Sequence, residues 1–212
     1  MHVPIPLLVA VILLAVVLTG VLGLSAAHQA RAQAQQYSNV TYITGPTNII
    51  RPGYYELAAN LSGTRSTGYC IGISASDVVL NGDGHLLSGN GSGIGIYVGP
   101  DSSNVTIEDI GVTSYSLDIY ISSSNDRVVN STVTDGGWNG LDITGNHVAV
   151  SGSVVSDNRY GISITGSNDA VYNDTISGNS IGLIVAGNHT AIFGDAISGS
   201  GLEDISITGS ND

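Results

Sequence analysis

The sequence predicts an all-β fold, a right-handed parallel β-helix with three short strands per coil and coils of 21–23 residues, behind an N-terminal hydrophobic leader helix. Three observations predict this fold. The octapeptide ISITGSND occurs at residues 162–169 and again at 205–212, 43 residues later. Aliphatic residues recur at constant offsets, and Gly, Asn, Ser and Asp separate them. A period in the low twenties, with β-branched residues alternating at period 2, is typical of a solenoid of stacked strands.

Each coil is built around one aliphatic anchor residue. The anchors are Val98, Ile121, Ile143, Ile164, Val185 and Ile207, which are separated by 23, 22, 21, 21 and 22 residues. Aliphatic residues also stand seven and twelve positions after the first five anchors: Val105 and Ile110, Val128 and Val133, Val150 and Val155, Val171 and Ile176, and Ile192 and Ile197. Because these offsets are constant, we expect the extra residues of the longer coils to lie in the turn that returns to the next anchor.

Polar residues repeat just after the anchors. Four positions after successive anchors stand Asn125, His147, Asn168, His189 and Asn211, and one position earlier stand Ser124, Asn146, Ser167, Asn188 and Ser210. Polar side chains stacked in register at a turn can hydrogen-bond along the axis of the stack. The repeated phrase therefore predicts a structural ladder without requiring any chemistry.

The chain divides into three segments. Residues 1–32 contain the apolar run LLVAVILLAVVLTGVLGL at 7–24 and read as a signal peptide, cut after Ala32, or as a membrane anchor. Residues 33–69 break the repeat and are expected to form a linker and cap, and residues 70–212 form the coils. Either reading of the leader implies export, so we expect a secreted or cell-surface protein.

The chain ends inside a coil. Asp212 follows the last anchor by only five residues, before any +7 or +12 strand of that coil. An open rung of strands is a template for edge-to-edge association unless it is capped. The sequence thus predicts either a longer protein or end-to-end pairing through this rung.

Two stretches resemble a known family. GYYELAANLSG at 53–63 and CIGISASDVVLNGDGHLLSGNGSGIGIYV at 70–98 resemble the opening of NosD-type right-handed parallel β-helix proteins, within the pectin-lyase-like superfamily, and the coils at 94–212 resemble its repeats. The resemblance implies this fold and an association with carbohydrate. It implies no single activity, because the superfamily includes sugar hydrolases, lyases, epimerases and adhesins.

Charge and cysteine content narrow the partners. The chain has 17 acidic and 5 basic residues, a net charge of −12, so it has no basic surface to neutralise nucleic-acid phosphates or an anionic membrane. Cys70 is the single cysteine, which excludes an intrachain disulfide and predicts a buried apolar side chain. No cofactor is expected.

Metal binding is weighed because NosD is linked to copper delivery. His147 and His189 share a ladder position but lie two rungs apart, about 9.6 Å by the spacing of β-strands. Ligands of one ion lie much closer than that, since each is only about 2 Å from the metal. The sequence therefore predicts no metal site, and a copper-maturation function rests on the resemblance alone.

Aromatic and acidic residues fall at outward positions of the anchor strands. Those outward positions read Tyr97, Tyr120, Asp142, Ser163, Ile184 and Ser206, and two residues earlier Gly95, Asp118, Gly140, Gly161, Gly182 and Asp204. The return turns add Tyr115, Trp138, Arg159 and Tyr160. Flat rings beside carboxylates suit the C–H faces and hydroxyls of sugars. The predicted carbohydrate contacts are Tyr97, Tyr120, Trp138, Asp142, Arg159 and Tyr160; the alternative is an ordinary outer face.

A polysaccharide-processing enzyme is the rival interpretation. Asp118 and Asp142 lie one rung apart and two residues offset, about 8 Å between Cα atoms, close to the separation used by inverting glycosidases. The chain lacks the paired-Asp, Gly-His-Gly and Arg-Ile-Lys motifs of the superfamily's hydrolases and the Tyr-Asp-Pro-His signature of its epimerases. We therefore expect a structural or adhesive, carbohydrate-contacting module rather than an enzyme.

Seven sequons accompany the predicted export. Their asparagines are Asn39, Asn60, Asn90, Asn104, Asn130, Asn173 and Asn188. Each is a candidate for N-glycosylation, although Asn, Ser and Thr are also abundant here as turn residues.

Overall fold

The computed structural model describes residues 39–211. The predicted leader and the first residues of the predicted linker lie outside this range. Within it, no helix is long and apolar enough to cross a membrane.

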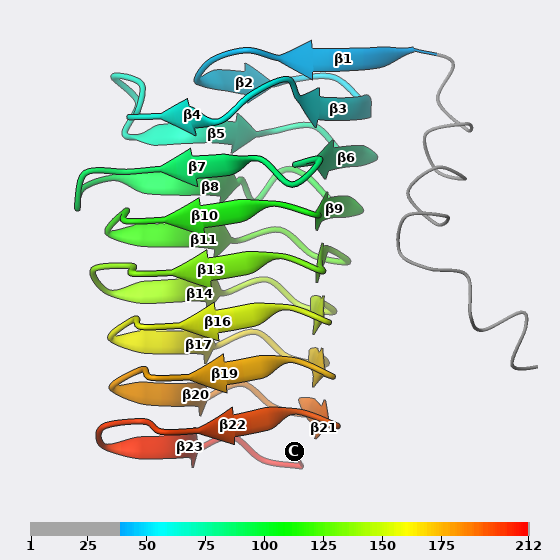
Figure 1. Ribbon diagram of the computed structural model, residues 1–212. Helices are drawn as coiled ribbons and strands as arrows, with labels where there is room; N and C mark the ends of the chain where they lie inside the picture. Colours follow the sequence, from blue (N-terminus) through cyan, green and yellow to red (C-terminus); the bar gives the residue numbers. More distant parts are fainter. Residues whose placement is uncertain (1–38, 212) are drawn as a thin grey trace, which may run out of the picture. The chain divides into compact units, whose positions relative to one another are not determined.

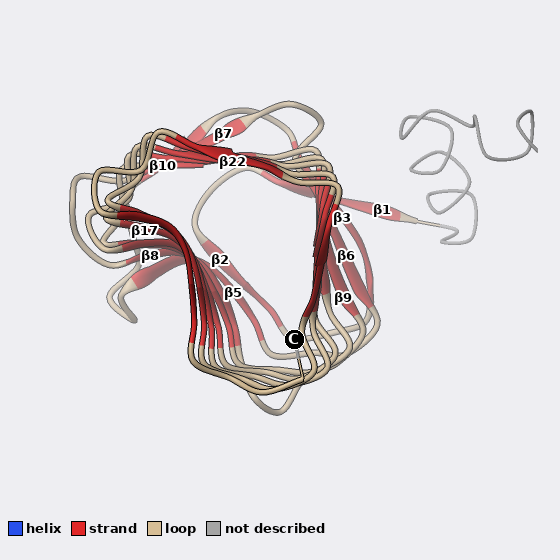
Figure 2. Ribbon diagram, turned by 90° about the horizontal axis from the view of Figure 1, so that it is seen from below, coloured by secondary structure: helices blue, strands red, loops and turns tan. Residues whose placement is uncertain are grey.

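The described residues form one parallel β-helix of the right-handed type, made of three sheets whose strands all pair in parallel (Figure 1). Sheet A contains β1 (Val40–Ile43), β3 (Gly53–Leu57), β6 (Val78–Asn81), β9 (Val105–Glu108), β12 (Arg127–Val129), β15 (Ala149–Ser151), β18 (Ala170–Tyr172) and β21 (Ala191–Phe193). Sheet B contains β2 (Thr47–Ile49), β5 (Tyr69–Ile73), β8 (Ile94–Val98), β11 (Leu117–Ile121), β14 (Asn139–Ile143), β17 (Tyr160–Ile164), β20 (Ile181–Val185) and β23 (Glu203–Ile207). Sheet C contains β4 (Leu61–Ser62), β7 (Leu86–Ser88), β10 (Gly111–Thr113), β13 (Thr132–Thr134), β16 (Val154–Ser156), β19 (Thr175–Ser177) and β22 (Ala196–Ser198). Seen along the axis, the three sheets enclose the core (Figure 2).

The strand register confirms the inward columns of sheet B. Val98 pairs with Ile121, Ile121 with Ile143, Ile143 with Ile164, and Ile164 with Val185. These side chains are fully buried, as are Ile96, Ile119, Leu141, Ile162 and Leu183 two residues earlier on the same strands. Like side chains therefore stack along the axis at the strand spacing of about 4.8 Å and form a continuous apolar core.

The coil that starts at Val98 corrects one prediction. Its extra residues lie in the first turn, not in the return turn, because Ile107 and not Val105 pairs with Val128. In the same way Val112, not Ile110, pairs with Val133. Val105 and Ile110 are nevertheless buried, so a shift of two residues leaves the apolar pattern unchanged. The longer coil after Ile121 does carry its extra residue in the return turn, as predicted, since Val133 pairs with Val155.

The phrase TGSND has a physical reason at every position. A Cβ at Gly166 would overlap the carbonyl oxygen of Gly145 on the rung before it, so the close stacking requires glycine. The Oγ of Ser167 accepts the N–H of Asn188 at 3.2 Å, and the Ser167 N–H donates to Oδ1 of Asn146 at 2.8 Å. Asn168 has a φ of 61°, which asparagine tolerates better than most residues. Oδ1 of the buried Asp169 accepts the N–H of Val148 at 2.7 Å.

The predicted ladder is therefore divided between three neighbouring positions. Asn125, His147, Asn168, His189 and Asn211 all have positive φ angles near 60°. They pair along the axis through their backbones, as in the bond from the Asn168 N–H to the Asn188 carbonyl at 2.9 Å. The side-chain ladder is made one residue earlier, by the Ser and Asn residues, and one residue later, by Asp126 and Asp169. The role of the +4 residues is thus to turn the chain.

A finer repeat of five residues runs through each coil. After Ile164, positive φ angles occur at Asn168, Asn173 and Gly178, one at each of the three turns. The residues that follow them, Asp169, Asp174 and Asn179, are buried and polar. Side-chain oxygens at these corners accept N–H groups of the preceding rung, for example Asp174 from Ser153 at 2.6 Å and Asn179 from Asn158 at 3.0 Å. Buried corners of the stack are satisfied in this way.

The stack begins before residue 70. Residues 40–62 contribute β1 to β4, which pair with β3, β5, β6 and β7 of the following coils. The described part of the predicted linker and cap is thus built into the three sheets.

At the other end, the inward residues of the last rung face outward from the stack's end. Ile205 and Ile207 are 45% and 47% exposed, whereas Leu183 and Val185, their partners on β20, are fully buried. End-to-end association through this rung stays a prediction. Light scattering of the chain at rising concentration should show a growing mass, and Ile207→Lys should reduce that growth while Ser206→Lys, on the outer face, should not. A dilution-independent monomer would contradict it.

Candidate functional site

The outer face of sheet B carries the predicted aromatic and acidic column. Tyr97, Tyr120, Asp142 and Ser163 pair in register on β8, β11, β14 and β17. The Tyr97 and Tyr120 rings stack with centroids 5.7 Å apart and planes 20° apart. The structure thus brings these three predicted contact residues into one line along the axis.

Tyr69, which the sequence analysis missed, extends this stack. Its ring lies 5.3 Å from that of Tyr97, with planes 13° apart, although Tyr69 pairs in register with Ile94. The ring leans over Gly72, where a Cβ would overlap it. A glycine opposite Tyr97 is the sequence signal for this arrangement, because it leaves room for a neighbouring ring.

Stacking limits what the tyrosines offer a ligand. The two faces of the Tyr97 ring are covered by Tyr69 and Tyr120, so Tyr97 presents its edge and hydroxyl. Tyr120 ends the stack on the side of Asp142, its partner in register on β14, and its hydroxyl lies 3.4 Å from Oγ1 of Thr144. Tyr120 and Asp142 are therefore the members of the column best placed to meet a sugar ring.

A second group of predicted residues lies where the chain passes from sheet C to sheet B. Trp138 precedes β14 and is 51% exposed. The guanidinium carbon of Arg159 lies 4.0 Å from the Trp138 ring centroid and 5.3 Å from that of Tyr160, so the cation bridges two rings. The backbone bonds from Trp138 to Ser116 at 2.9 Å and from Tyr160 to Trp138 at 2.8 Å hold these residues on successive rungs.

Arg159 keeps its donors available. Among residues 39–211, no carboxylate lies within ion-pair distance of its guanidinium. A planar cation on an exposed indole, with free N–H groups, can donate hydrogen bonds to sugar hydroxyls while the ring meets the sugar's C–H groups.

Asp142 stands on β14 directly after this group. Its carboxyl is half-buried, and burial raises its pKa, while a hydrogen bond with the Asn139 side chain acts in the opposite direction. It is an acceptor held between Tyr120 and Ser163 on the outer surface.

Asp118 corrects the predicted catalytic pair. It is fully buried and not outward, because β11 bends there: Leu117 and Ile119 pair with Asn139 and Leu141, and Asp118 is skipped. Its Oδ1 accepts the Tyr115 N–H at 3.0 Å, and its Oδ2 has no hydrogen-bond partner among the described residues. Burial, with a smaller effect of Asp135, raises the pKa of Asp118 to about 8 despite the Tyr115 bond. Asp118 and Asp142 thus lie on opposite sides of the sheet and do not face one substrate.

Tyr115 is a second correction of the outward set. It is the largest of the fully buried side chains in the described residues, and its hydroxyl donates to the Gly63 carbonyl at 3.2 Å. Cys70, a neighbour of its hydroxyl, is buried as predicted, and burial raises the pKa of the thiol. Both belong to the core and not to a ligand surface.

A buried polar chain on sheet A has no counterpart in the sequence analysis. Asn81 donates to Tyr54 Oη at 2.7 Å and to Glu108 Oε1 at 3.3 Å. Burial and the charge of Asp109 raise the pKa of Glu108 to about 7, against the hydrogen bond from Asn81, and burial raises the pKa of Tyr54 to about 12. Their 27-residue spacing crosses the coils of irregular length, so no repeat marks them. All three are nearly closed to solvent, which makes the chain a structural connection between rungs.

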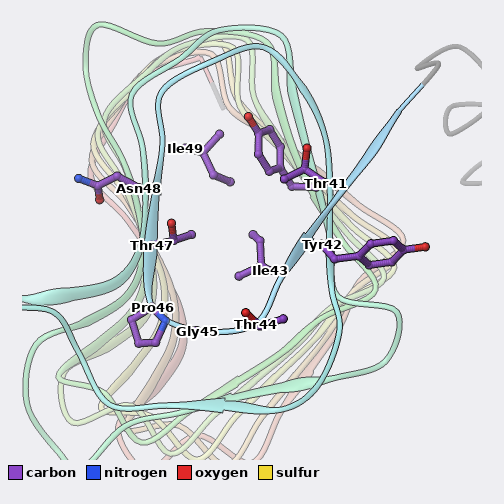
Figure 3. Close-up of a pocket in the computed structure, with 10 residues that line it drawn as sticks. Thr41, Tyr42, Ile43, Thr44, Gly45, Pro46, Thr47, Asn48 and Ile49 are labelled. Atoms are coloured by element: carbon purple, nitrogen blue, oxygen red, sulfur yellow. The ribbon is translucent and has the colours of Figure 1, made fainter.

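The first coil contains a hollow of about 320 Å³. It is lined by residues 41–49 and Tyr55, and Figure 3 shows Ile43 and Ile49 pointing into the coil. The hollow belongs to the upper end of the core and contains none of the predicted contact residues.

Metal ligands do not gather in the described part of the chain. There, no group of three or more His, Cys, Asp or Glu is arranged to hold an ion. His147 and His189 occupy equivalent turns two rungs apart, with positive φ angles of 58° and 59°.

No protein-family model matches the sequence, and a search of curated proteins finds no match. The fold thus stands on the structure, and the NosD-type identity stays an expectation.

Proposed function

We propose that this protein is an exported, secreted or cell-surface β-helix module, structural or adhesive, that contacts carbohydrate through the outer side of sheet B. The observation that carries the proposal is the exposed Trp138 ring with Arg159 stacked on it, next to Tyr160, Asp142 and Tyr120. Rings, hydroxyl donors and a carboxylate acceptor on one side are the groups that sugar binding uses.

The rigidity of the support favours binding. Parallel pairing on both sides fixes β14 and β17, and the core beneath them is fully buried. Side chains on such a frame lose little conformational freedom when a ligand binds. Because the carboxyls considered for hydrolysis are divided between the interior and the surface, we propose binding without cleavage.

Substitutions on this side should weaken binding of a surface polysaccharide. Trp138→Ala removes the exposed ring and the support of Arg159, and we expect about tenfold weaker binding, since such a ring contributes about 1–1.5 kcal/mol. Tyr120→Ala should have a smaller effect, because one ring face already contacts Tyr97. Calorimetry against a panel of neutral and acidic polysaccharides measures both.

Phe193→Ala is the matched control. Phe193 is also an exposed ring in a stack, 5.1 Å from Tyr172, but it lies on sheet A. Its loss should leave binding unchanged. If no polysaccharide in the panel binds the parent protein, or if Phe193→Ala weakens binding as much as Trp138→Ala, the proposal is wrong.

A further inference from the structure

The seven sequons differ in how the fold uses their residues. A transferase that glycosylates a folded protein must reach the Asn side chain, the residue after it and the hydroxyl two positions on. In six sequons at least one of these residues lies in a strand or is buried: Val40, Leu61, Val105, Ser131, Asp174 and Thr190. Asn90, Gly91 and Ser92 are all exposed and lie outside the strands of residues 39–211.

Side-chain hydrogen bonds separate the sequons further. Nδ2 of Asn104 donates to Asp77 at 2.7 Å, and Nδ2 of Asn130 donates to Asp109. The side-chain oxygens of Asn60 and Asn188 accept N–H groups of Leu86 and Ser210 at 3.0 and 2.9 Å. A glycan on these asparagines would have to break bonds between rungs, which costs free energy at each site.

Asn90 lies in a turn with room around it. The turn at 89–93 joins β7 to β8, and a Cβ built at Gly91 would meet nothing within 4 Å. The Ser92 hydroxyl donates to Oδ1 of Asn90 at 2.7 Å, so the two groups that define the sequon lie together while Nδ2 stays free of protein partners among the described residues. A bond from the Gly91 N–H to the Ser114 carbonyl at 2.7 Å anchors the turn to the next coil.

We infer that Asn90 is the site at which the folded protein accepts an N-linked sugar. The reaction needs a transferase and a hexose activated as a nucleoside diphosphate. Nδ2 of Asn90 forms a bond to the anomeric carbon, the bond from that carbon to the phosphate oxygen breaks, and the nucleoside diphosphate leaves with the electron pair. The amide proton passes to a base of the transferase. This inference is independent of carbohydrate binding by Trp138.

The test treats the folded full chain with a soluble N-glycosyltransferase and a nucleoside-diphosphate glucose. Intact mass should first rise by one hexose, and peptide mapping should place it on Asn90. Ser92→Ala, which keeps the asparagine, should abolish this first addition, and the matched change Ser62→Ala in the Asn60 sequon should not. Synthetic peptides spanning all seven sequons should each accept a sugar, which shows that the fold makes the selection. Earlier addition at any other sequon, or no addition to a folded chain whose Asn90 peptide is modified, would overturn the inference.

Discussion

Ile164→Asp is expected to destabilise the protein by several kcal/mol, because it places a carboxylate in a continuous apolar stack. Ile164 is fully buried and pairs in register with Ile143 above and Val185 below. No polar partner stands beside it on these strands. Thermal unfolding followed by circular dichroism should show a large fall in the midpoint, or no cooperative transition at all.

Ser163→Asp is the control for this change. Ser163 is the preceding residue on β17 and faces outward between Asp142 and Ile184. Its substitution adds the same charge at the same rung, with a modest repulsion from Asp142 that salt screens. A midpoint close to that of the parent is expected. Equal effects of the two substitutions would refute the inward and outward assignment of β17.

The protein is expected to be more stable near pH 4 than near pH 8. Burial raises the pKa of Asp118 to about 8, of Glu108 to about 7, and of Asp169 and Asp174 to about 6 in the folded chain. The folded chain thus binds more protons than the unfolded chain between the ordinary carboxyl pKa and these values. Stability is greatest below the ordinary pKa and is lost as pH rises through the raised values. Each pKa unit corresponds to about 1.4 kcal/mol.

The groups that face these carboxyls do not reverse the sign. Asp135 lies near Asp118, Asp195 near Asp174 and Asp109 near Glu108, and each raises the pKa further. Only His147, beside Asp169, acts in the opposite direction among the charged side chains that affect these four carboxyls, and burial outweighs it. Thermal midpoints measured from pH 4 to pH 8 should therefore fall steadily.

Asp118→Asn should remove much of this pH dependence. The asparagine oxygen can still accept the Tyr115 N–H, and Asn158 and Asn179 already cap the equivalent corner of lower coils in this way. We expect a higher midpoint than the parent at pH 8 and a similar one at pH 4. Asp101→Asn, at an exposed turn, should keep the parent's slope. Stability that rises with pH in the parent would disprove the protonated state of these carboxyls.

Sequence by itself determined the coil. Aliphatic residues alternate at period 2 along the strands from Ile121 to Val185, and this alternation fixes which side chains enter the core. The αL turns are also written locally, since Asn168 and Gly178 occupy positions that most residues avoid. These features are local, so spacing and residue type sufficed to predict them, down to the return turn after Val133.

Only the tertiary structure decided the register of the Val98 coil, because a slip by two residues preserves the inward face and exchanges Val105 for Ile107. It also decided the fate of Asp118: where β11 bends, two neighbouring residues turn inward, and alternation no longer predicts the side. The stacking of Tyr69 on Tyr97 and the free turn at Asn90 depend on contacts between rungs more than 20 residues apart. Such contacts depend on the space that neighbouring coils leave, and no single coil contains that information.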